Sequence, residues 1–425
     1  MFKSIARHPL IQLLKNNKGN PRTLILMEPL WGIPFNLIAP FATLYMYLQG
    51  ITDTQIGLIL SISMVVQVLF SFLGGIITDK LGRKVSTMMG DFFGWSLACL
   101  IWAFSNNFWL FLIAVLFNSL EQINQTAWFC LLIEDGDEDD MLGMYTWIHI
   151  GGLVAVFFAP LAGFLIGGFS LIPVVRVLYL TFATTMFIKV ILTYRYCDET
   201  GQGKIRMAET KSISVKEMLS EYKLLIPKVL KNLDVMKIVS VNVIFRITSL
   251  VSATFFGLYI TRSLGVSETY LAFFPILNAF VMLVFMVGLQ HKLEAIKFRI
   301  PMWIGLLLLI IGHILLISLP TGNLILIAIY VFLLAVANAL IEPRRGALLQ
   351  LYLDREERAR LNALIITFVI AFTAPFGYLT GFLSTLNPRF PFILSLGLFL
   401  IAILIVGKLN DPQSKSEAIA ENTTH

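Results

Sequence analysis

The chain has 425 residues, of which 57% are apolar and only 14% are charged, and its net charge is +6. Soluble globular proteins carry roughly 25% charged residues, and a soluble fold of this size could not cover its surface with so few charges. Disorder, collagen and coiled coil are excluded by the same numbers. Cys99, Cys130 and Cys197 have no metal-ligand spacing and form no disulfide framework. The composition predicts an integral membrane protein without a metal or other cofactor.

Apolar segments of the length that a membrane helix needs, about 20 residues, recur along the whole chain. They are continuously apolar and do not alternate in roughly ten-residue pieces, which predicts helices rather than barrel strands. The fold class is therefore an all-α polytopic membrane protein with twelve spans. The predicted spans are residues 24–48, 55–78, 87–105, 108–132, 144–169, 173–193, 238–260, 268–290, 300–319, 323–343, 362–384 and 390–408.

The basic residues indicate the orientation of these spans. If the spans alternate in direction, 27 of the 32 lysines and arginines fall on the same side as both termini. By the positive-inside rule this side is cytoplasmic, so we expect a protein of the cell membrane with both termini in the cytoplasm. The net positive charge follows from this topology and does not indicate a nucleic-acid partner. The apolar run Ile11–Leu14 is too short to be the core of a cleavable signal peptide.

The first predicted span contains proline residues and one amide. Pro29, Pro34 and Pro40 are expected to bend it, because proline cannot donate the helical hydrogen bond. Asn36 shares a helix face with Pro40 and is a candidate residue of a polar cavity.

The loop between the second and third spans has a distinctive pattern. Residues 75–84 read Gly-Ile-Ile-Thr-Asp-Lys-Leu-Gly-Arg-Lys. A glycine allows two helices to approach closely, and a second glycine allows a short loop to reverse. Asp79 can face the positive N-terminal end of a neighbouring helix, and the basic residues can lie near anionic lipid headgroups.

This loop resembles, without a mismatch, the signature Gly-x-x-x-Asp-Arg/Lys-x-Gly-Arg/Lys-Arg/Lys of the major facilitator superfamily. The resemblance covers the whole chain and implies two bundles of six helices that alternate between outward-facing and inward-facing states. It further implies that the loop latches the bundles in the outward-facing state. The gating-loop residues assigned in this way are Gly75, Asp79, Lys80, Gly82, Arg83 and Lys84.

The fourth predicted span has the most polar side chains. Four of them fall within about a 100° arc of one helix and have a tryptophan beside them: Asn118, Glu121, Gln122, Gln125 and Trp128. Polar groups at membrane depth usually face a cavity or a partner, although contacts between helices would explain them as well. Amides beside a tryptophan face suit a hydroxyl-rich solute such as a sugar. This span has no arginine or lysine, so the pattern typical of drug/proton antiporters of the superfamily is missing.

Two polar segments follow on the predicted cytoplasmic side. Residues 134–140 include six acidic residues and are predicted to form a solvated loop that pairs with arginines of residues 344–361. Residues 194–237 separate the two halves of the chain. Within them, Ser214 and Glu217 have capping-box spacing, which predicts an amphipathic helix on the membrane surface with Met218, Tyr222, Leu225 and Ile226 on its apolar face.

The halves look related. Ala159-Pro160 in the fifth span corresponds to Ala374-Pro375 in the eleventh, and Gly75 corresponds to Gly288. Such matches in equivalent spans favour a parallel internal repeat. The predicted organisation is an N-terminal segment 1–23, a bundle 24–193, a linker 194–237, a second bundle 238–408 and a tail 409–425.

In the second half, Asn242, Arg246 and Asn278 are candidate cavity residues. Arg246 could pair with Glu121 across the two bundles or bind an anionic group of the substrate. Asp91 and Lys189 are placed near the ends of their spans, where packing against loops or snorkelling explains them. His313 is predicted to be an interior or lipid-edge histidine.

No nucleophile with its base, nucleotide-binding loop or metal cluster is recognisable, so an enzyme is not predicted. The sequence predicts a monomeric secondary transporter, a symporter or antiporter, for a small polar metabolite such as a sugar. We expect the lipid bilayer to surround the protein, and the proton is a candidate coupling ion. The alternative in the same superfamily is a multidrug efflux permease, which the 34 phenylalanines favour. A transporter-shaped sensor or scaffold would require an extra cytoplasmic domain, for which no segment is long enough.

Overall fold

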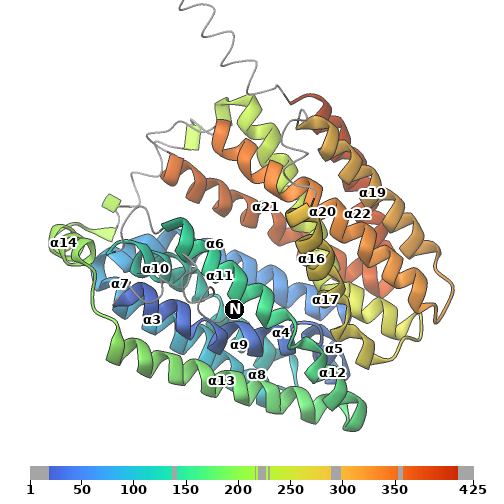
Figure 1. The fold of residues 1–425 in the computed structure, drawn as a ribbon, viewed down its shortest axis with the longest axis horizontal. Helices are drawn as coiled ribbons and strands as arrows, with labels where there is room; N and C mark the ends of the chain where they lie inside the picture. The colour runs from blue at the N-terminus through green and yellow to red at the C-terminus, as the bar shows by residue number, and fades with distance from the viewer. Residues whose placement is uncertain are drawn as a thin grey trace, which may run out of the picture. The chain divides into compact units, whose positions relative to one another are not determined.

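The computed structural model describes residues 19–135, 141–215, 217–218, 226–227, 230–288, 298–352 and 358–409, and the regular elements among them are helices (Figure 1). Residues 1–51 and 62–219 form one compact unit, here the N-terminal unit. Residues 52–61 and 220–425 form the other, the C-terminal unit. Helix α6 therefore begins in the second unit and continues into the first.

The helices before the linker are α3 (Asn20–Met27), α4 (Pro29–Ile38), α5 (Ala42–Leu48), α6 (Asp53–Leu81), α7 (Arg83–Met89), the π-helix η1 (Gly90–Leu97), α8 (Ala98–Phe104), α9 (Phe108–Asn118), α10 (Glu121–Ile133), α11 (Met141–Val156), α12 (Ala159–Gly168) and α13 (Leu171–Tyr196), with α14 (Gly201–Thr210) in the linker. The later helices are α16 (Leu233–Arg262), the 3-10 helix η3 (Glu268–Ala272), α17 (Phe274–Gly288), α19 (Arg299–Ser318), α20 (Leu324–Tyr352), α21 (Arg358–Leu386) and α22 (Phe390–Gly407).

All twelve predicted spans fall on helical segments where the structure describes them. Among the described residues, ten helical stretches are long and apolar enough to cross a membrane, and a bent pair, Asn20–Ile38 with Ala42–Leu48, makes eleven. The bend of 48° lies beside Pro40, which confirms the predicted kink. The remaining predicted span is divided into α9 and α10 by a turn at Ser119 and Leu120, so neither helix has the required length alone.

The spans expose apolar side chains, as helices in lipid do. Only 28–56% of the most apolar stretch of each span is buried, and Phe164, Trp109 and Leu404 are each about two-thirds exposed. In water such a surface would be unfavourable, whereas lipid accepts it. A helix also satisfies its backbone hydrogen bonds internally, which a bilayer requires. The outward faces therefore fit the predicted membrane environment.

Glycines bring η1 close to α10 in the N-terminal unit. A Cβ added to Gly90 would lie 3.0 Å from the Cα of Asn124, and one added to Gly94 would lie 3.0 Å from the backbone nitrogen of Glu121. Larger residues would separate the two helices. This close approach places the polar face of α10 beside Trp95 of η1. Helix α13 packs against α4, α8 and η1, and its course beside α8 is visible in Figure 1.

The C-terminal unit holds the first residues of α6 by polar contacts. The carboxylate of Asp53, which is 5% exposed, accepts hydrogen bonds from Arg262 Nη1 at 2.9 and 3.1 Å and from Ser384 Oγ at 2.7 Å. One turn further, a Cβ on Gly57 would lie 2.9 Å from the Cα of Gly381 in α21. Residues 52–61 therefore pack on α21 through glycine-to-glycine contact, and the buried Asp53 pairs with the exposed Arg262 at the end of α16.

The linker is described in part. The predicted capping box is confirmed, because Ser214 N donates to Glu217 Oε2 at 2.9 Å and Glu217 N donates to Ser214 Oγ at 3.2 Å. Tyr222 and Leu225, which the predicted amphipathic face includes, lie outside the described residues. Helix α14, earlier in the linker, was not predicted.

The two Ala-Pro pairs of the predicted repeat differ in local structure. Pro160 lies in the first turn of α12, after a turn at Phe157 and Phe158 that interrupts the fifth span, whereas Pro375 lies inside the continuous helix α21. A proline fits the first turn of a helix without loss of a hydrogen bond. The internal repeat stays a prediction.

Candidate functional site

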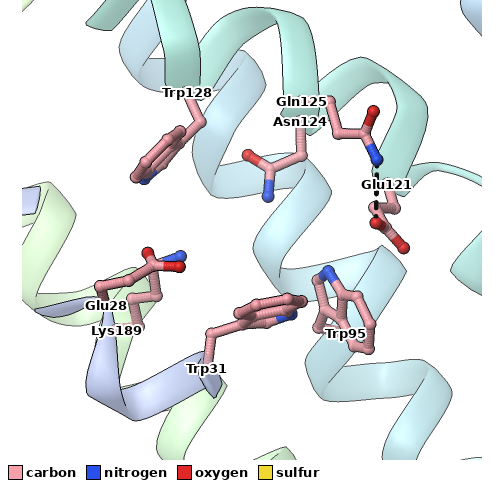
Figure 2. Close-up of a pocket in the computed structure, with 8 residues that line it drawn as sticks. All are labelled: Glu28, Trp31, Trp95, Glu121, Asn124, Gln125, Trp128 and Lys189. Atoms are coloured by element: carbon pink, nitrogen blue, oxygen red, sulfur yellow. Dashed lines mark hydrogen bonds between the residues drawn. The ribbon is translucent and has the colours of Figure 1, made fainter. Parts of the chain in front are cut away.

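A cavity of about 170 Å³ lies within the N-terminal unit. Helices α4, η1, α10 and α13 contribute to its wall, together with the junction of α3 and α4 (Figure 2). Its lining side chains are aromatic, amide or charged: Glu28, Trp31, Trp95, Glu121, Asn124, Gln125, Trp128 and Lys189.

The side chains from the first span are positioned by a proline junction. Glu28 separates α3 from α4, and Pro29 begins α4, where its missing N–H costs nothing. One turn later the ring of Trp31 stacks on Phe35, with centroids 4.9 Å apart, and meets Trp95 edge to face at 5.6 Å. This aromatic cluster fixes the wall of the cavity opposite α10 (Figure 2).

Behind the cavity lies a buried ion pair. Lys189 Nζ of α13 is 3.3 Å from Asp91 Oδ1 and Oδ2 in η1, and the two residues are 3% and 0% exposed. Asn124 Nδ2 donates to Asp91 Oδ1 at 2.7 Å. The buried Asn124 Oδ1 has no hydrogen-bond partner among the described residues, and Asn124 lines the cavity.

Two carboxylates line the cavity on different sides. Glu121 Oε1 accepts a hydrogen bond from Gln125 Nε2 at 3.1 Å, one turn along α10 (Figure 2). Glu28, from the opposite wall, interacts electrostatically with Lys189 and Asp91. Lys189 lines the cavity as well, so both acidic and basic side chains contribute to its wall.

The structure brings some of the predicted cavity residues together. Glu121, Gln125 and Trp128 line the cavity. Asn118 instead donates to the carbonyl oxygen of Gly94 at 2.8 Å. Gln122 accepts a hydrogen bond from Ser71 in α6 at 3.3 Å, so these two amides connect helices.

The other predicted residues make local contacts. Asn36 and Asn242 donate to carbonyl oxygens one turn earlier in their own helices, both at 2.8 Å. Asn278 Nδ2 lies 3.9 Å from the sulfur of Met282. Arg246 is exposed and belongs to the C-terminal unit, whereas Glu121 belongs to the other unit. Their pairing therefore stays a prediction.

The expectation that Asp91 and Lys189 pack against loops or snorkel was wrong. They form a buried pair, of which Lys189 lines the cavity, because η1 packs against α13. Four lining residues were not predicted as cavity residues: Glu28, Trp31, Trp95 and Asn124. A signal was present for Glu28, since an acidic residue within a predicted span is a candidate functional residue.

The C-terminal unit contains a smaller cavity of about 70 Å³. Hydroxyl and amide side chains contribute to its wall, among them Thr248, Ser252 and Asn338. His313, which is 1% exposed, also lines it, and its Nδ1 lies 2.9 Å from the carbonyl oxygen of Leu309. His313 is thus an interior histidine, which is one of the two environments, interior or lipid edge, that were predicted for it.

The gating loop reverses the chain between α6 and α7. Gly82 has a φ of +88°, a conformation that favours glycine. Arg83, which is 4% exposed, pairs with Asp79 at 3.0 Å and with Glu134 at 2.9 Å. Glu134 is the first residue of the acidic segment. The ion pair that it forms with Arg83 joins two residues of the N-terminal unit. Residues 136–140 lie outside the described residues.

The acid at the N-terminal end of α7 is Glu199, which was not predicted. Its carboxylate accepts hydrogen bonds from the backbone nitrogens of Arg83 and Lys84 at 2.9 and 3.0 Å. These are first-turn N–H groups, which have no partner within the helix and favour an anion. Asp79 does not occupy this position, because its carboxylate pairs with Arg83 and Arg206.

Helix α14 of the linker is seated on this loop. Arg206 pairs with Asp79 at 2.8 Å, and this hydrogen bond raises the pKa of Arg206. Lys80 Nζ donates to the carbonyl oxygens of Thr210 and Ile213 at 2.9 and 2.7 Å. The carbonyls at the end of α14 thus receive a cation, as helix C-termini favour.

Comparison with known proteins supports the family resemblance of the sequence. The family model described as Major Facilitator Superfamily matches residues 30–293. A protein of Bacillus subtilis (strain 168), described as the uncharacterized MFS-type transporter YqjV, is 32% identical over 147 residues, which are 34% of this chain and 36% of that protein. The matched part thus spans about a third of this curated relative.

Solved structures share the fold over nearly the whole chain. A variant of the nucleoside transporter NupG has a TM-score of 0.70 at 15% identity and covers 91% of this chain and 98% of its own. A variant of the peptide transporter POT in complex with sulfate has a TM-score of 0.69 at 14% identity and covers 95% and 99%. At these identities the similarity shows the fold alone.

The ion pair yields a prediction about stability. Lys189→Met leaves Asp91 as a lone buried carboxylate and is expected to lower the free energy of unfolding by about 3–5 kcal/mol. The double variant Asp91→Asn/Lys189→Met should lose less than the sum of the single variants. Thermal unfolding in detergent measures all three proteins. Additive losses would show that the two residues contribute independently.

A second prediction concerns α14. Arg206→Ala removes a half-exposed pair worth roughly 0–1 kcal/mol, so α14 should leave the loop about two- to fivefold more often while the unfolding midpoint stays unchanged. Limited proteolysis in residues 198–214 measures this opening. Lys204→Ala is the control, because Lys204 is an exposed cation of the same helix. Equal cleavage of both variants would contradict the role of the Arg206 contact.

Proposed function

The chain belongs to the major facilitator superfamily and is a multi-pass membrane transporter, and we propose that it moves a small organic solute by alternating access, driven by a gradient. The polar cavity of the N-terminal unit is the observation that supports this proposal most. Charged groups at membrane depth are costly and mark substrate or ion pathways. Here they occur together with unpartnered polar atoms and aromatic rings around a space that can hold a solute.

We assign the solute contacts of this unit to α10 and the first span. Glu121, Gln125 and Trp128 form one side, and Glu28 and Trp31 form the other. In the C-terminal unit, our candidates for contact with the solute remain Asn242, Arg246 and Asn278. The proton is the proposed coupling ion, because a carboxyl group in an apolar surrounding can bind and release it.

For the gating loop, Gly75 to Lys84, we propose a latch that is controlled by its ion pairs. Asp79 and Arg83 are held by Arg206 and Glu134 in this structure. The family resemblance implies that this loop latches the bundles in the outward-facing state. We therefore propose that α14 is released from Asp79 when the loop latches. We propose further that both termini are cytoplasmic, that the protein resides in the cell membrane and that it is a monomer.

A second candidate within transport is efflux of a drug-like solute. Three tryptophans line the cavity, and one of its amides, Gln125, is already bonded to Glu121. A sugar requires many donors and acceptors, whereas flat apolar groups suit tryptophan faces. The cavity therefore favours an aromatic or apolar solute over the sugar-like solute that the sequence suggested.

The test is flux in proteoliposomes, with and without a proton gradient, against sugars, nucleosides, amino acids and cationic dyes. Glu121→Gln should lower gradient-driven uptake by about tenfold or more, because an amide cannot carry the proton, and should leave exchange of solute for solute intact. Asp198→Asn is the control, since Asp198 is an exposed acidic residue of the linker. Absence of flux for every solute would contradict the transport function. Equal loss of uptake and exchange would contradict proton coupling through Glu121.

A further inference from the structure

We propose that the transported solute carries a neutral, flat heteroaromatic ring with an N–H donor and a carbonyl acceptor, which bind Asn124 and Trp128 in the cavity of the N-terminal unit. This inference rests on the proposed transport function and names its substrate class. Acidic and basic side chains both line the cavity, so its charges do not select the solute by themselves. The selection comes from the neutral groups of the wall that lack a partner.

Asn124 offers the solute an acceptor in a fixed orientation. Its Nδ2 donates to Asp91 Oδ1 at 2.7 Å, so the amide oxygen is the atom that points away from Asp91. The residue is 8% exposed, and its buried Oδ1 has no hydrogen-bond partner among the described residues. A Cβ added to Gly90 of η1 would lie 3.0 Å from the Cα of Asn124, so the backbone of α10 is held closely here. An N–H group of the solute would satisfy this oxygen.

Trp128 offers a donor one turn further along α10. Its ring packs against a buried cluster that includes Leu24 and Leu131, so the core fixes the position of the indole. The indole Nε1 can only donate, and it is buried without a hydrogen-bond partner among the described residues. Residues four apart on a helix share a face, and Figure 2 shows Asn124 and Trp128 on the side of α10 that faces Trp31. A carbonyl oxygen of the solute would satisfy this donor.

The two groups together require a molecule that both donates and accepts. A buried polar atom without a hydrogen bond is unfavourable, and the acceptor of Asn124 and the donor of Trp128 do not bond to each other. A heteroaromatic ring with an N–H and a carbonyl group supplies both partners from one rigid body. Water is the other source of this chemistry, and the remaining wall of the cavity distinguishes a ring from water.

The aromatic wall and the size of the cavity favour a ring. Three of the seven tryptophans of the chain line it, and Trp31 and Trp95 meet edge to face with centroids 5.6 Å apart. Aromatic side chains prefer offset-stacked or edge-to-face contact with another ring. A cavity of about 150 Å³ is enough for benzene, and the cavity here is about 170 Å³. One ring with its carbonyl group therefore fills it.

Pyridones are small neutral probes with these properties. Their ring nitrogen carries a hydrogen and their carbonyl oxygen accepts, and the two groups are adjacent in 2-pyridone and opposite in 4-pyridone, so the pair covers both spacings. The N-methyl derivative of each pyridone is the matched control, because methylation blocks the donor and keeps the ring and the carbonyl group. Binding to the purified full chain in detergent is measured by calorimetry.

We expect at least one pyridone to bind about tenfold or more tightly than its own N-methyl derivative, because the derivative leaves Asn124 Oδ1 buried without a partner. If water satisfies the two groups instead, each pyridone and its derivative bind equally. Equal affinities in both pairs, or no binding of either pyridone, would overturn the inference.

Variants of the two residues give different patterns. Asn124→Leu removes the acceptor, so the preferred pyridone should bind as weakly as its N-methyl derivative. Trp128→Phe keeps a ring and removes the donor, so both probes should bind about fivefold more weakly while the preference remains. Asn106→Leu and Trp109→Phe are the matched controls and should change neither affinity, because Asn106 is exposed between α8 and α9 and Trp109 is 68% exposed on α9.

A preference that survives in Asn124→Leu would overturn the role of Asn124, and unchanged binding in Trp128→Phe would overturn the role of Trp128. Asn124→Leu also removes the hydrogen bond to Asp91. If this variant does not yield folded protein by gel filtration, the two probes with Trp128→Phe still decide whether the ring binds in this cavity.

Flux of the same probes in proteoliposomes separates this inference from the proposed function. Preferential binding of a pyridone without flux of any solute would contradict transport while it supports the site. Flux of a solute without preferential pyridone binding would overturn the substrate class while it supports transport. Preferential binding and flux of the same pyridone would support both.

Discussion

The buried ion pair between Asp91 and Lys189 is the interaction on which the cavity of the N-terminal unit depends. It joins η1 to α13 in the wall of the cavity, and it also holds the amide of Asn124 on α10. Three helices are therefore connected through one carboxylate that is 0% exposed. Lys189 lines the cavity together with Glu28 and Glu121. A hydrophobic replacement of the pair could be as stable, but it would leave Asn124 without a fixed orientation.

A second constraint is the close packing of η1 and α10. Gly90 and Gly94 have no side chains to separate the helices, and the π-helical turn lies at the same place. π-Helical turns are frequent at functional sites because they shift the direction of side chains. Trp95 consequently comes into edge contact with Trp31, and the polar face of α10 lies opposite both. The cavity is thus a result of backbone geometry as much as of its polar residues.

The sequence predicted the fold well because the signals for membrane helices are strong and local. Long apolar runs define the spans, and the loop from Gly75 to Lys84 matches a family pattern in the expected place. The cavity was predicted only in part. Helical spacing grouped Glu121, Gln125 and Trp128 on one face, but it also included Asn118 and Gln122, whose contacts with other helices do not follow from one helix alone. Spacing along a helix does not show which neighbour it meets.

The same limit explains why the partners of Asp91 and Asp79 were not predicted. Lys189, the partner of Asp91, is almost a hundred residues away in sequence and is recognisable only after the helices pack. Asp79 pairs with an arginine of α14, a helix that was not foreseen. Contacts between distant segments decide both sites, and no local pattern encodes them.

The central claim is that the solute binds in the cavity of the N-terminal unit. The most direct measurement is solute protection of a cysteine at Gln125, in a chain whose Cys99, Cys130 and Cys197 are replaced by serine. Gln125 is exposed and lines the cavity. The rate of its labelling by a water-soluble maleimide should fall severalfold at a saturating concentration of the solute with the largest flux, while a cysteine at Trp109 keeps its rate. Unchanged labelling at Gln125 with that solute bound would contradict this account.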